Sequence, residues 1–349
     1  MKRILLVSPF PPYIGGVSVS VNRLYYKLKD DGLQVHKYDI HYLNKTLNKY
    51  KILLFLRFLF LPLYLMLSKR FDVIHFHVSG DLTKAYVSFF RFLFSEKSKF
   101  ISTIHGDVTN LLNKRFGKTC LSGFDLIICV KEGDASILSK YYKVSIKEIP
   151  AFIPPSCNNF EALPKEVLDF FKSAPLKITI MGSVICDENY YDLYGLKDAI
   201  VLVNKLKKEK KDIKLFLINL GNKSGRIGLS YLLELKKYIN ENNLDDYVYI
   251  YEGTTLDFMS VLKETDIFIR PTMTDGDALS IREALYLKIP TIASNIVDRP
   301  NGTILYDRLD PFDLYKKTLN VINNYKFYKN NFFSINTDFY NEIKKSYEI

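Results

Sequence analysis

Short apolar runs alternate with amphipathic stretches along most of the chain. An apolar run bounded by turn residues predicts a buried strand, and apolar residues three and four positions apart predict a helix. In the first half these patterns predict strands at residues 2–8, 33–40, 72–77, 100–105 and 124–130, with a helix at 18–29. Strands that alternate with helices are typical of a parallel, doubly wound sheet.

The second half repeats this rhythm. Strands are predicted at residues 177–182, 213–220, 247–251, 266–269 and 290–293, and helices at 195–207, 229–240, 256–263, 312–321 and 339–347. A chain of 349 residues is long for one hydrophobic core and suits two domains. We therefore expect two parallel-sheet α/β domains in sequence.

Residues 52–67 depart from this rhythm because they are apolar on every helical face except at Arg57. Spanning a bilayer takes about 20 apolar residues, and this run has sixteen with Pro62 inside it. A helix without a polar face must bury its outer side in protein or in lipid. We favour monotopic docking on a membrane surface, and a buried core or dimer helix is the alternative. The residues expected to face the membrane are Leu54, Phe55, Phe58, Leu59 and Phe60.

The charge of the chain is uneven in a way that agrees with this docking. Residues 1–170 hold 24 lysines and arginines against 14 acids, a balance of +10, whereas residues 171–349 hold 25 against 24. A basic half predicts an anionic partner. No nucleic-acid-binding module is recognisable, so we favour acidic lipid over nucleic acid. The four cysteines lack metal-like spacing and no signal peptide begins the sequence. These features predict a cytoplasmic protein, peripheral on the inner face of the cell membrane, without a metal or cofactor.

Residues 270–294 combine a strand end, a polar turn, a helix and a second strand. Asp275, Gly276 and Asp277 form the turn, and Asp277 is a plausible N-cap of the helix. A helix N-terminus behind a tight turn offers unpaired N–H groups to an anion. Asp275 and Glu283, eight positions apart, add carboxylates suited to the sugar and the ribose of a sugar nucleotide.

This stretch resembles the Glu-x7-Glu signature of the family 4 retaining glycosyltransferases, with Asp275 in the first acidic position. The resemblance implies the GT-B fold, in which two Rossmann-like, doubly wound parallel-sheet domains face each other across a cleft. It implies that Asp275 faces the donor sugar and Glu283 the ribose. The donor-binding residues expected around them are Gly276, Asp277, Ala278, Leu279, Ser280 and Arg282.

Two further matches to that family lie in the first half, in the same order along the chain. Gly15 and Gly16, after the first strand, resemble its Gly-Gly loop, which faces donor phosphate and acceptor. His105, at the end of a later strand, resembles its histidine, which bonds a hydroxyl of the donor sugar. By strand alternation His75 is expected to be structural, and the pattern leaves His77 open.

One departure bears on the activity. In the family the first strand of the second domain ends Gly-Arg, with a lysine about a dozen residues later, and the two cations neutralise the donor diphosphate. Here Gly182, which is also expected to bind the donor, precedes Ser183, and no lysine stands at the matching position. Arg282, Arg270 and Arg299 are candidates to replace these cations.

We therefore predict a metal-independent retaining hexosyltransferase that moves a sugar from a nucleotide-sugar donor, UDP-sugar favoured, to a lipid-linked saccharide in bacterial surface-polysaccharide synthesis. The expected domains are an acceptor and membrane-facing domain at 1–170, a donor domain at 171–325, and a helix at 326–349 that crosses back. A non-catalytic GT-B partner subunit and a nucleotide-sugar epimerase are the alternatives. Replacing Asp275 by Ala is expected to abolish transfer without unfolding the chain.

Overall fold

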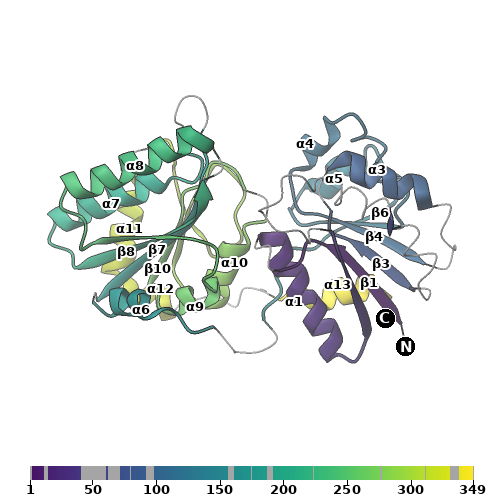
Figure 1. Ribbon diagram of the computed structural model, residues 1–349, viewed down its shortest axis with the longest axis horizontal. Coiled ribbons are helices and arrows are strands. Elements are labelled where there is room, and N and C mark those ends of the chain that lie inside the picture. Colours follow the sequence, from purple (N-terminus) through teal and green to yellow (C-terminus); the bar gives the residue numbers. More distant parts are fainter. Residues whose placement is uncertain are drawn as a thin grey trace. The chain divides into compact units, whose positions relative to one another are not determined.

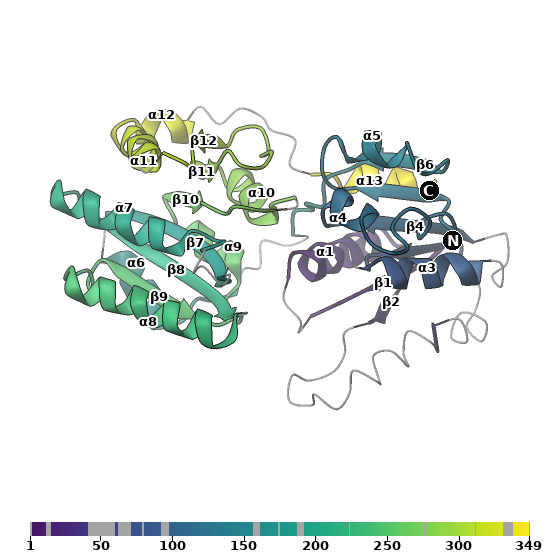
Figure 2. The ribbon, with the colours of Figure 1, turned by 90° about the horizontal axis from the view of Figure 1, so that it is seen from above.

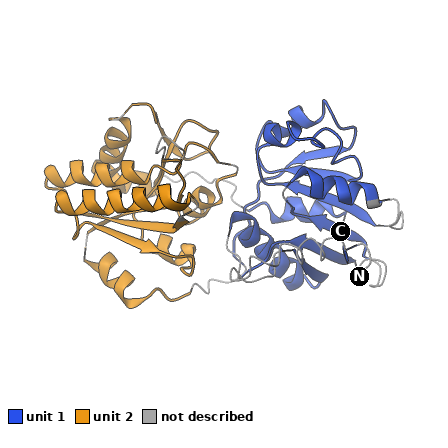
Figure 3. Cartoon of the chain, turned by 45° about the horizontal axis from the view of Figure 1, so that its top comes forward, with its two compact units in different colours: residues 1–156, 338–349 blue, residues 157–337 orange. Residues whose placement is uncertain are grey.

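The computed structural model describes residues 2–11, 15–40, 60–61, 71–78, 80–91, 98–155, 161–173, 175–186, 192–222, 224–275, 277–310, 312–330 and 338–348. Gly276, Leu54, Phe55, Phe58 and Leu59 lie outside these ranges. Contacts within the chain define two compact units, residues 1–156 with 338–349 and residues 157–337, coloured separately in Figure 3.

Unit 1 is built on a six-stranded parallel sheet with the order β2-β1-β3-β4-β5-β6. Its strands are β1 (Arg3–Ser8), β2 (Gln34–Asp39), β3 (Val73–Phe76), β4 (Lys99–Ile104), β5 (Leu126–Cys129) and β6 (Ser145–Glu148). Its helices are α1 (Gly16–Asp30), α3 (Asp81–Phe90), α4 (Val108–Leu112), α5 (Asp134–Leu138) and α13 (Tyr340–Ser346). They are labelled in Figure 1 where there is room.

The two faces of this sheet carry different contents. On one face Leu5, Phe76 and Ile127 pack with Val87 of α3 and Leu138 of α5. The other face carries His75 and Thr103, whose side chains are buried. There α13 lies beside α1, and Tyr347, directly after α13, is buried and hydrogen-bonds His75. The last residues of the chain thus complete the core of its first unit.

Unit 2 repeats the design with the order β12-β11-β10-β7-β8-β9, again with every pair parallel. Its strands are β7 (Leu176–Val184), β8 (Ile213–Asn222), β9 (Val248–Glu252), β10 (Ile267–Arg270), β11 (Thr291–Ser294) and β12 (Ile304–Tyr306). Its helices are α6 (Lys165–Lys172), α7 (Leu196–Lys208), α8 (Gly225–Glu241), α9 (Phe258–Lys263), α10 (Leu279–Tyr286), α11 (Asp313–Asn323) and α12 (Tyr325–Asn330).

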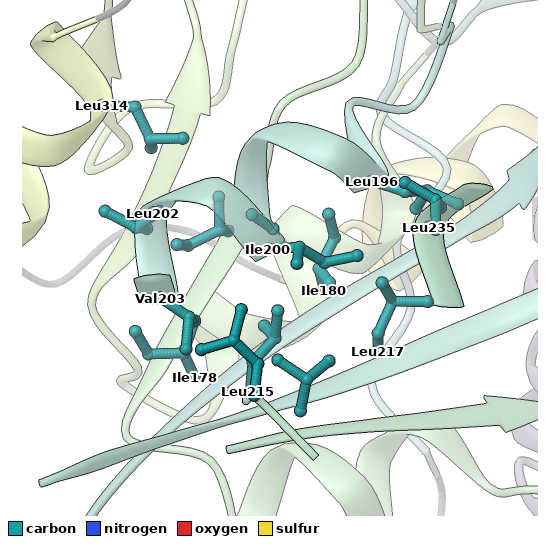
Figure 4. Close-up of a cluster of buried hydrophobic side chains, with 14 of the residues drawn as sticks. Ile178, Ile180, Leu196, Ile200, Leu202, Val203, Leu215, Leu217, Leu235 and Leu314 are labelled. Atoms are coloured by element: carbon teal, nitrogen blue, oxygen red, sulfur yellow. The ribbon is translucent and has the colours of Figure 1, made fainter. Parts of the chain in front are cut away.

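Strand alternation divides the core of unit 2 between two layers of helices, with α7 and α8 on one face of the sheet and α6 and α9 on the other (Figure 1). Figure 2 looks down on the layer of α7 and α8. Leu215 and Leu217 of β8 pack against α7 and α8 in the cluster drawn in Figure 4. Phe216 and Ile218, between and after them, pack on the other face against α6. Strands buried on both faces read as continuous apolar runs, which is why this half of the sequence predicts its strands well.

The predicted fold class is confirmed, since both units are doubly wound parallel sheets. The predicted strands and helices are present, except that the apolar run at 52–67 lies outside the described residues but for residues 60 and 61. The structure adds α3. It also adds the short helices α4, α5, α6 and α12 and the edge strands β6 and β12. Such segments have few residues to show a period. The units divide at 156/157, ahead of the expected 170/171, because α6 packs on Phe216 of the second sheet.

Candidate functional site

The topology of unit 1 creates one crevice by itself. The chain leaves β1 for β2 on one side and later enters β3 on the other side, so the loops after β1 and β3 diverge. In open α/β sheets ligands bind outside the carboxyl ends of the strands at such a switch point. In unit 1 this point lies between the loops that follow β1, β3 and β4.

A pocket of about 400 Å³ occupies this position. It collects residues from four separate segments of the chain, which follow the strands β1, β2, β3 and β4 and extend into or just past the next helix. Its polar and glycine lining consists of Gly15, Gly16, His77, Gly80, Lys84, His105, Gly106, Asp107, Asn110 and Lys114. The predicted residues Gly15, Gly16 and His105 are therefore brought together, with their roles still predictions.

The glycine loop leaves its side of the pocket open. A Cβ added to Gly16 or to Gly106 would meet no atom within 4 Å, so packing does not require glycine at either position. The Gly15 N–H donates to Ser18 Oγ at 3.0 Å, while the first N–H groups of α1 lie at a helix N-terminus, where no intrahelical acceptor exists. The loop can thus admit a ligand close to backbone donors.

Three histidines form a row behind the pocket. His77 Nδ1 lies 2.9 Å from His105 Nε2, and the ring centroids of His75 and His77 are 4.0 Å apart. His75 is held by hydroxyls on both sides, Thr103 Oγ1 and Tyr347 Oη, each at 2.7 Å. The row therefore runs from the sheet interior to the pocket, and only its outer members, His77 and His105, line the cavity.

Burial keeps these imidazoles neutral. Desolvation, with a smaller effect from neighbouring His105, lowers the pKa of His75 to about 3. Desolvation and the charge of Lys84 lower the pKa of His105 to about 4, and burial places the pKa of His77 well below its usual value. At neutral pH the row offers hydrogen bonds without carrying charge.

The positive charge of the pocket comes from lysines that sequence reasoning did not single out. Lys84 is 3% exposed, and its ammonium donates to the carbonyl oxygens of Val78 at 2.7 Å and Gly80 at 3.4 Å. Burial lowers its pKa to about 8. Lys114 lines the same cavity. Neither lysine lies in a sequence motif. The fold places them at the pocket, because α3 and the segment after α4 both lie at this edge of the sheet.

The corresponding switch point of unit 2 lies between β7 and β10, where an ion network has formed. Arg270 donates to both carboxylate oxygens of Asp275, at 3.0 and 2.9 Å, and to the carbonyl of Met181 at 2.8 Å. Arg299 donates to Asp275 at 2.8 Å and to the carbonyl of Ser294 at 3.0 Å. Two guanidinium charges and one carboxylate leave a net charge of +1.

This network decides the ionisation of Asp275. Burial pushes the pKa of its carboxyl up, but the charges and hydrogen bonds of Arg270 and Arg299 outweigh that effect and hold the pKa below its usual value. The side chain of Arg299 is 1% exposed. Asp275 is thus the counter-ion of two buried arginines, a structural task additional to the predicted contact with the donor sugar.

The helix after this turn differs in detail from the sequence expectation. Ala278, not Asp277, occupies the N-cap of α10, because the carboxylate of Asp277 pairs with Arg282 one turn into the helix. Leu279 and Ser280 begin the helix, and Glu283 within it is 4% exposed. All three candidate replacement cations, Arg270, Arg282 and Arg299, therefore already have acidic partners.

Gly182 has a packing role at the end of β7. A Cβ at this position would lie 2.7 Å from Cβ of Tyr194, too close for any real contact. The Tyr194 ring in turn stands 5.0 Å from the guanidinium carbon of Arg270. The glycine therefore makes room for a ring that packs on the arginine network, and its predicted donor contact remains a prediction.

Unit 1 also carries apolar side chains on its surface. Leu82 and Phe89, one heptad apart on α3, are 62% and 65% exposed. Phe60, from the predicted membrane-facing set, is 54% exposed, whereas the adjacent Leu61 is buried in the same cluster as Val87 of α3. Among the helices that the structure describes, none has the length and hydrophobicity needed to cross a bilayer.

Removing the carboxylate of Asp275 is expected to destabilise unit 2, which revises the expectation from sequence. Asp275→Ala leaves two buried guanidinium groups without their counter-ion, which typically costs about 3–5 kcal/mol. Urea unfolding measures the change, with Glu234→Ala as the control. Glu234 makes an exposed ion pair with Lys197, worth at most about 1 kcal/mol. Equal effects of the two substitutions would show that the network does not stabilise the fold.

Acidification is expected to weaken unit 1 through His75. Its pKa is lower in the folded chain than in the unfolded chain, so the unfolded chain binds more protons as the pH falls below about 6.5. The contribution of His75 to the free energy of unfolding is complete above that pH. It falls by about 2 kcal/mol by pH 5. Urea unfolding of the wild type and His75→Gln measures this, because their difference in unfolding free energy should narrow by that amount between pH 7 and pH 5. A constant difference would contradict the prediction.

Known proteins resemble this chain at two levels. No protein-family model matches it. It is 26% identical over 219 residues to protein CapJ of Staphylococcus aureus, a match that covers 63% of this chain and 51% of that protein. It is 27% identical over 244 residues to the O-antigen biosynthesis glycosyltransferase WclY of Escherichia coli, covering 65% and 62%. The chain thus spans about half to three-fifths of these curated relatives.

An uncharacterized glycosyltransferase of Methanocaldococcus jannaschii, MJ1178, matches at greater length, with 23% identity over 358 residues that cover 93% of this chain and 89% of that protein. Among solved structures, sucrose-phosphate synthase from Thermosynechococcus elongatus aligns over 100% of this chain and 98% of its own, with a TM-score of 0.72 and 14% identity. Anabaena HepE in complex with UDP and glucose aligns over 99% and 95%, with a TM-score of 0.65 and 11% identity.

At these identities the structural matches establish the fold. The GT-B architecture predicted from the sequence is confirmed. The sequence matches confirm the predicted resemblance to glycosyltransferases of the surface-polysaccharide type, and the assignment to family 4 remains a prediction.

Proposed function

We propose that this chain is a retaining glycosyltransferase that moves a sugar from a nucleotide sugar to a lipid-linked saccharide during bacterial surface-polysaccharide synthesis. The observation that carries the proposal is the pocket of unit 1, which joins the Gly15–Gly16 loop to His105 at the switch point of the sheet. The sequence similarity to an O-antigen glycosyltransferase supports the same class of reaction.

The donor nucleotide is assigned to unit 2. Glu283 would accept hydrogen bonds from the ribose, and the N–H groups of Ala278, Leu279 and Ser280 would hold phosphate at the start of α10. The usual Gly-Arg and lysine are absent, so we assign their charge to Arg270 and Arg299. Their network with Asp275 keeps a net charge of +1, which favours an anion beside it.

The reaction needs little covalent chemistry from the protein. In a retaining transfer on one face of the sugar, the bond from the anomeric carbon to the donor phosphate breaks while the acceptor oxygen bonds the same carbon. The departing phosphate oxygen takes the acceptor proton. Protein groups then contribute by orienting the sugar and by stabilising the negative charge that grows on the phosphate. Neutral His105 and a positive arginine network are suited to these two tasks.

The donor is proposed to be a UDP-sugar. HepE, which shares the fold, has been solved with UDP and glucose, and this is the support for uracil as the base. The acceptor is assigned to unit 1, where Lys84 and Lys114 line the pocket and would attract the phosphate of a lipid-linked saccharide. The proposal includes no metal ion, because the arginines carry the positive charge at the diphosphate.

The exposed apolar side chains of unit 1 are proposed to rest on the inner face of the cell membrane. Leu82 and Phe89 of α3 and Phe60 share large exposed fractions in the half of the chain whose net charge is +10. Apolar anchors on a basic half of the chain suit an interface that contains acidic lipid. Such docking would bring the pocket of unit 1 to a substrate held in the membrane.

Nucleotide binding tests the donor assignment. Thermal unfolding is measured with UDP, GDP, ADP, TDP and CMP, each with and without EDTA. We expect UDP to raise the melting temperature in both conditions, because a ligand at about 100 times its Kd stabilises the folded state by about 2.7 kcal/mol. Glu283→Gln should diminish the rise, and the distant Glu234→Gln should leave it unchanged.

A chain that responds to no nucleotide would contradict the transferase and favour a non-catalytic partner subunit. Given binding, turnover of UDP-sugar only in the presence of a lipid-linked acceptor distinguishes a transferase from an epimerase.

Co-sedimentation with vesicles tests the membrane surface. The wild type should bind vesicles that contain acidic lipid, and Leu82→Glu with Phe89→Glu should weaken binding at least about tenfold, since burying each side chain contributes about 1.5–3 kcal/mol. Leu233→Glu, on an equally exposed position of α8 in unit 2, is the matched control. Equal binding by the double variant and the control would exclude α3 from the interface.

A further inference from the structure

The contact between His77 and His105 has two possible arrangements of its proton. The atoms that meet are His77 Nδ1 and His105 Nε2, 2.9 Å apart, so one nitrogen must donate and the other must accept. A neutral imidazole carries a single N–H, and the choice at this contact therefore fixes the other nitrogen of each ring. It decides whether His105 Nδ1 is a donor or an acceptor.

The surroundings of His77 favour one arrangement. His77 is 5% exposed, and its Nε2 is buried without a hydrogen-bond partner among the residues that the structure describes. If His105 donated, this Nε2 would carry a hydrogen and become a buried, unsatisfied N–H group. If His77 donates from Nδ1, its Nε2 is only an unused lone pair. Orphaned buried donors are rarer than under-used acceptors, so His77 is the donor.

The charges around the pair agree with two neutral rings. Lys84, from α3, lines the same pocket and disfavours a second positive charge on His105. On the sheet side His77 packs against the ring of His75, which is itself buried between two hydroxyl partners. Asp107, the exposed acid of the lining, directs one carboxylate oxygen to the N–H of Asn110 at 2.8 Å.

We propose that His77 is a positioning residue that holds His105 in the tautomer with its hydrogen on Nδ1. His105 lines the pocket, and its Nδ1 makes no hydrogen bond to the described residues. It thus presents one neutral N–H donor to the ligand, suited to a sugar hydroxyl or a phosphate oxygen. The role of this donor in catalysis rests on the proposed function, whereas the assignment of the tautomer does not.

Nitrogen NMR of the full chain labelled with ¹⁵N-histidine tests the tautomer directly. The sequence has 5 histidines, so the ring signals are few, and the loss of one set in His105→Asn assigns His105. At neutral pH we expect a protonated Nδ1 and an unprotonated Nε2 for His105. A protonated Nε2 would overturn the proposal, whatever the protein catalyses.

Two substitutions test whether His77 is the cause. His77→Asn keeps a donor, because its amide nitrogen is as many bonds from the backbone as imidazole Nδ1, and it should preserve the tautomer. His77→Leu fills similar space without a donor, and His105 should then populate both tautomers. If His105 stays entirely Nδ1-protonated in His77→Leu, another group sets the tautomer and the proposal fails. Should His77→Leu not fold, His77→Ala, which also lacks the donor, is measured in its place and should likewise populate both tautomers of His105.

Transfer kinetics connect the tautomer to the reaction. In His77→Leu the N–H donor that His105 offers to the substrate is no longer fixed, and kcat/KM should fall about ten- to hundredfold. In His77→Asn the donor stays fixed, and kcat/KM should remain within about threefold of the wild type. Equal losses in both variants would overturn the positioning role. Absence of transfer in the wild type with the expected NMR result would instead contradict the proposed function alone.

Discussion

Parallel strand pairing is the constraint on which both units depend. Parallel strands need a crossover connection between them, and here helices fill the crossovers and cover both faces of each sheet. Strands such as β8 are consequently buried on both sides, and they have no room for chemistry along their length. Polar residues lie where the strands end. Two groups of them lie at the switch points β1/β3 and β7/β10, where the loops diverge.

The two switch points solve the burial of polar groups in different ways. Unit 2 buries full charges, and it does so by giving Arg270 and Arg299 a shared carboxylate and several carbonyl oxygens. Unit 1 buries groups that can lose their charge. Its three imidazoles remain neutral and are joined to one another or to hydroxyls, with Tyr347 supplied by the end of the chain. One site is therefore charged and rigidly paired, and the other combines a neutral row of histidines with two lysines, Lys84 and Lys114, around a pocket.

This contrast suits the two tasks of the proposed sugar transfer. A leaving diphosphate needs fixed positive charge, whereas a sugar or a hydroxyl needs directional donors and acceptors in a partly dry cavity. In the proposed function the arginine network takes the place of the missing Gly-Arg and lysine, and Arg270 reaches the end of β7 through the carbonyl of Met181. Gly182 and Tyr194 connect that strand end to Arg270 through packing.

The sequence by itself determined the fold class and most helices and strands. The spacing of hydrophobic residues and the residues at turns are local properties, and the tertiary packing of this chain agrees with them. It also predicted that Gly15, Gly16 and His105 lie after strands, and the structure brings them to one pocket, with their roles still predictions. Tertiary structure alone decided the partners. Arg299 donates a hydrogen bond to Asp275, 24 positions earlier, and Tyr347 hydrogen-bonds His75, 272 positions earlier. Lys84 of α3 lines the same pocket as His105. Such contacts join residues that no spacing relates, and they set the ionisation and hydrogen bonding on which the chemistry depends.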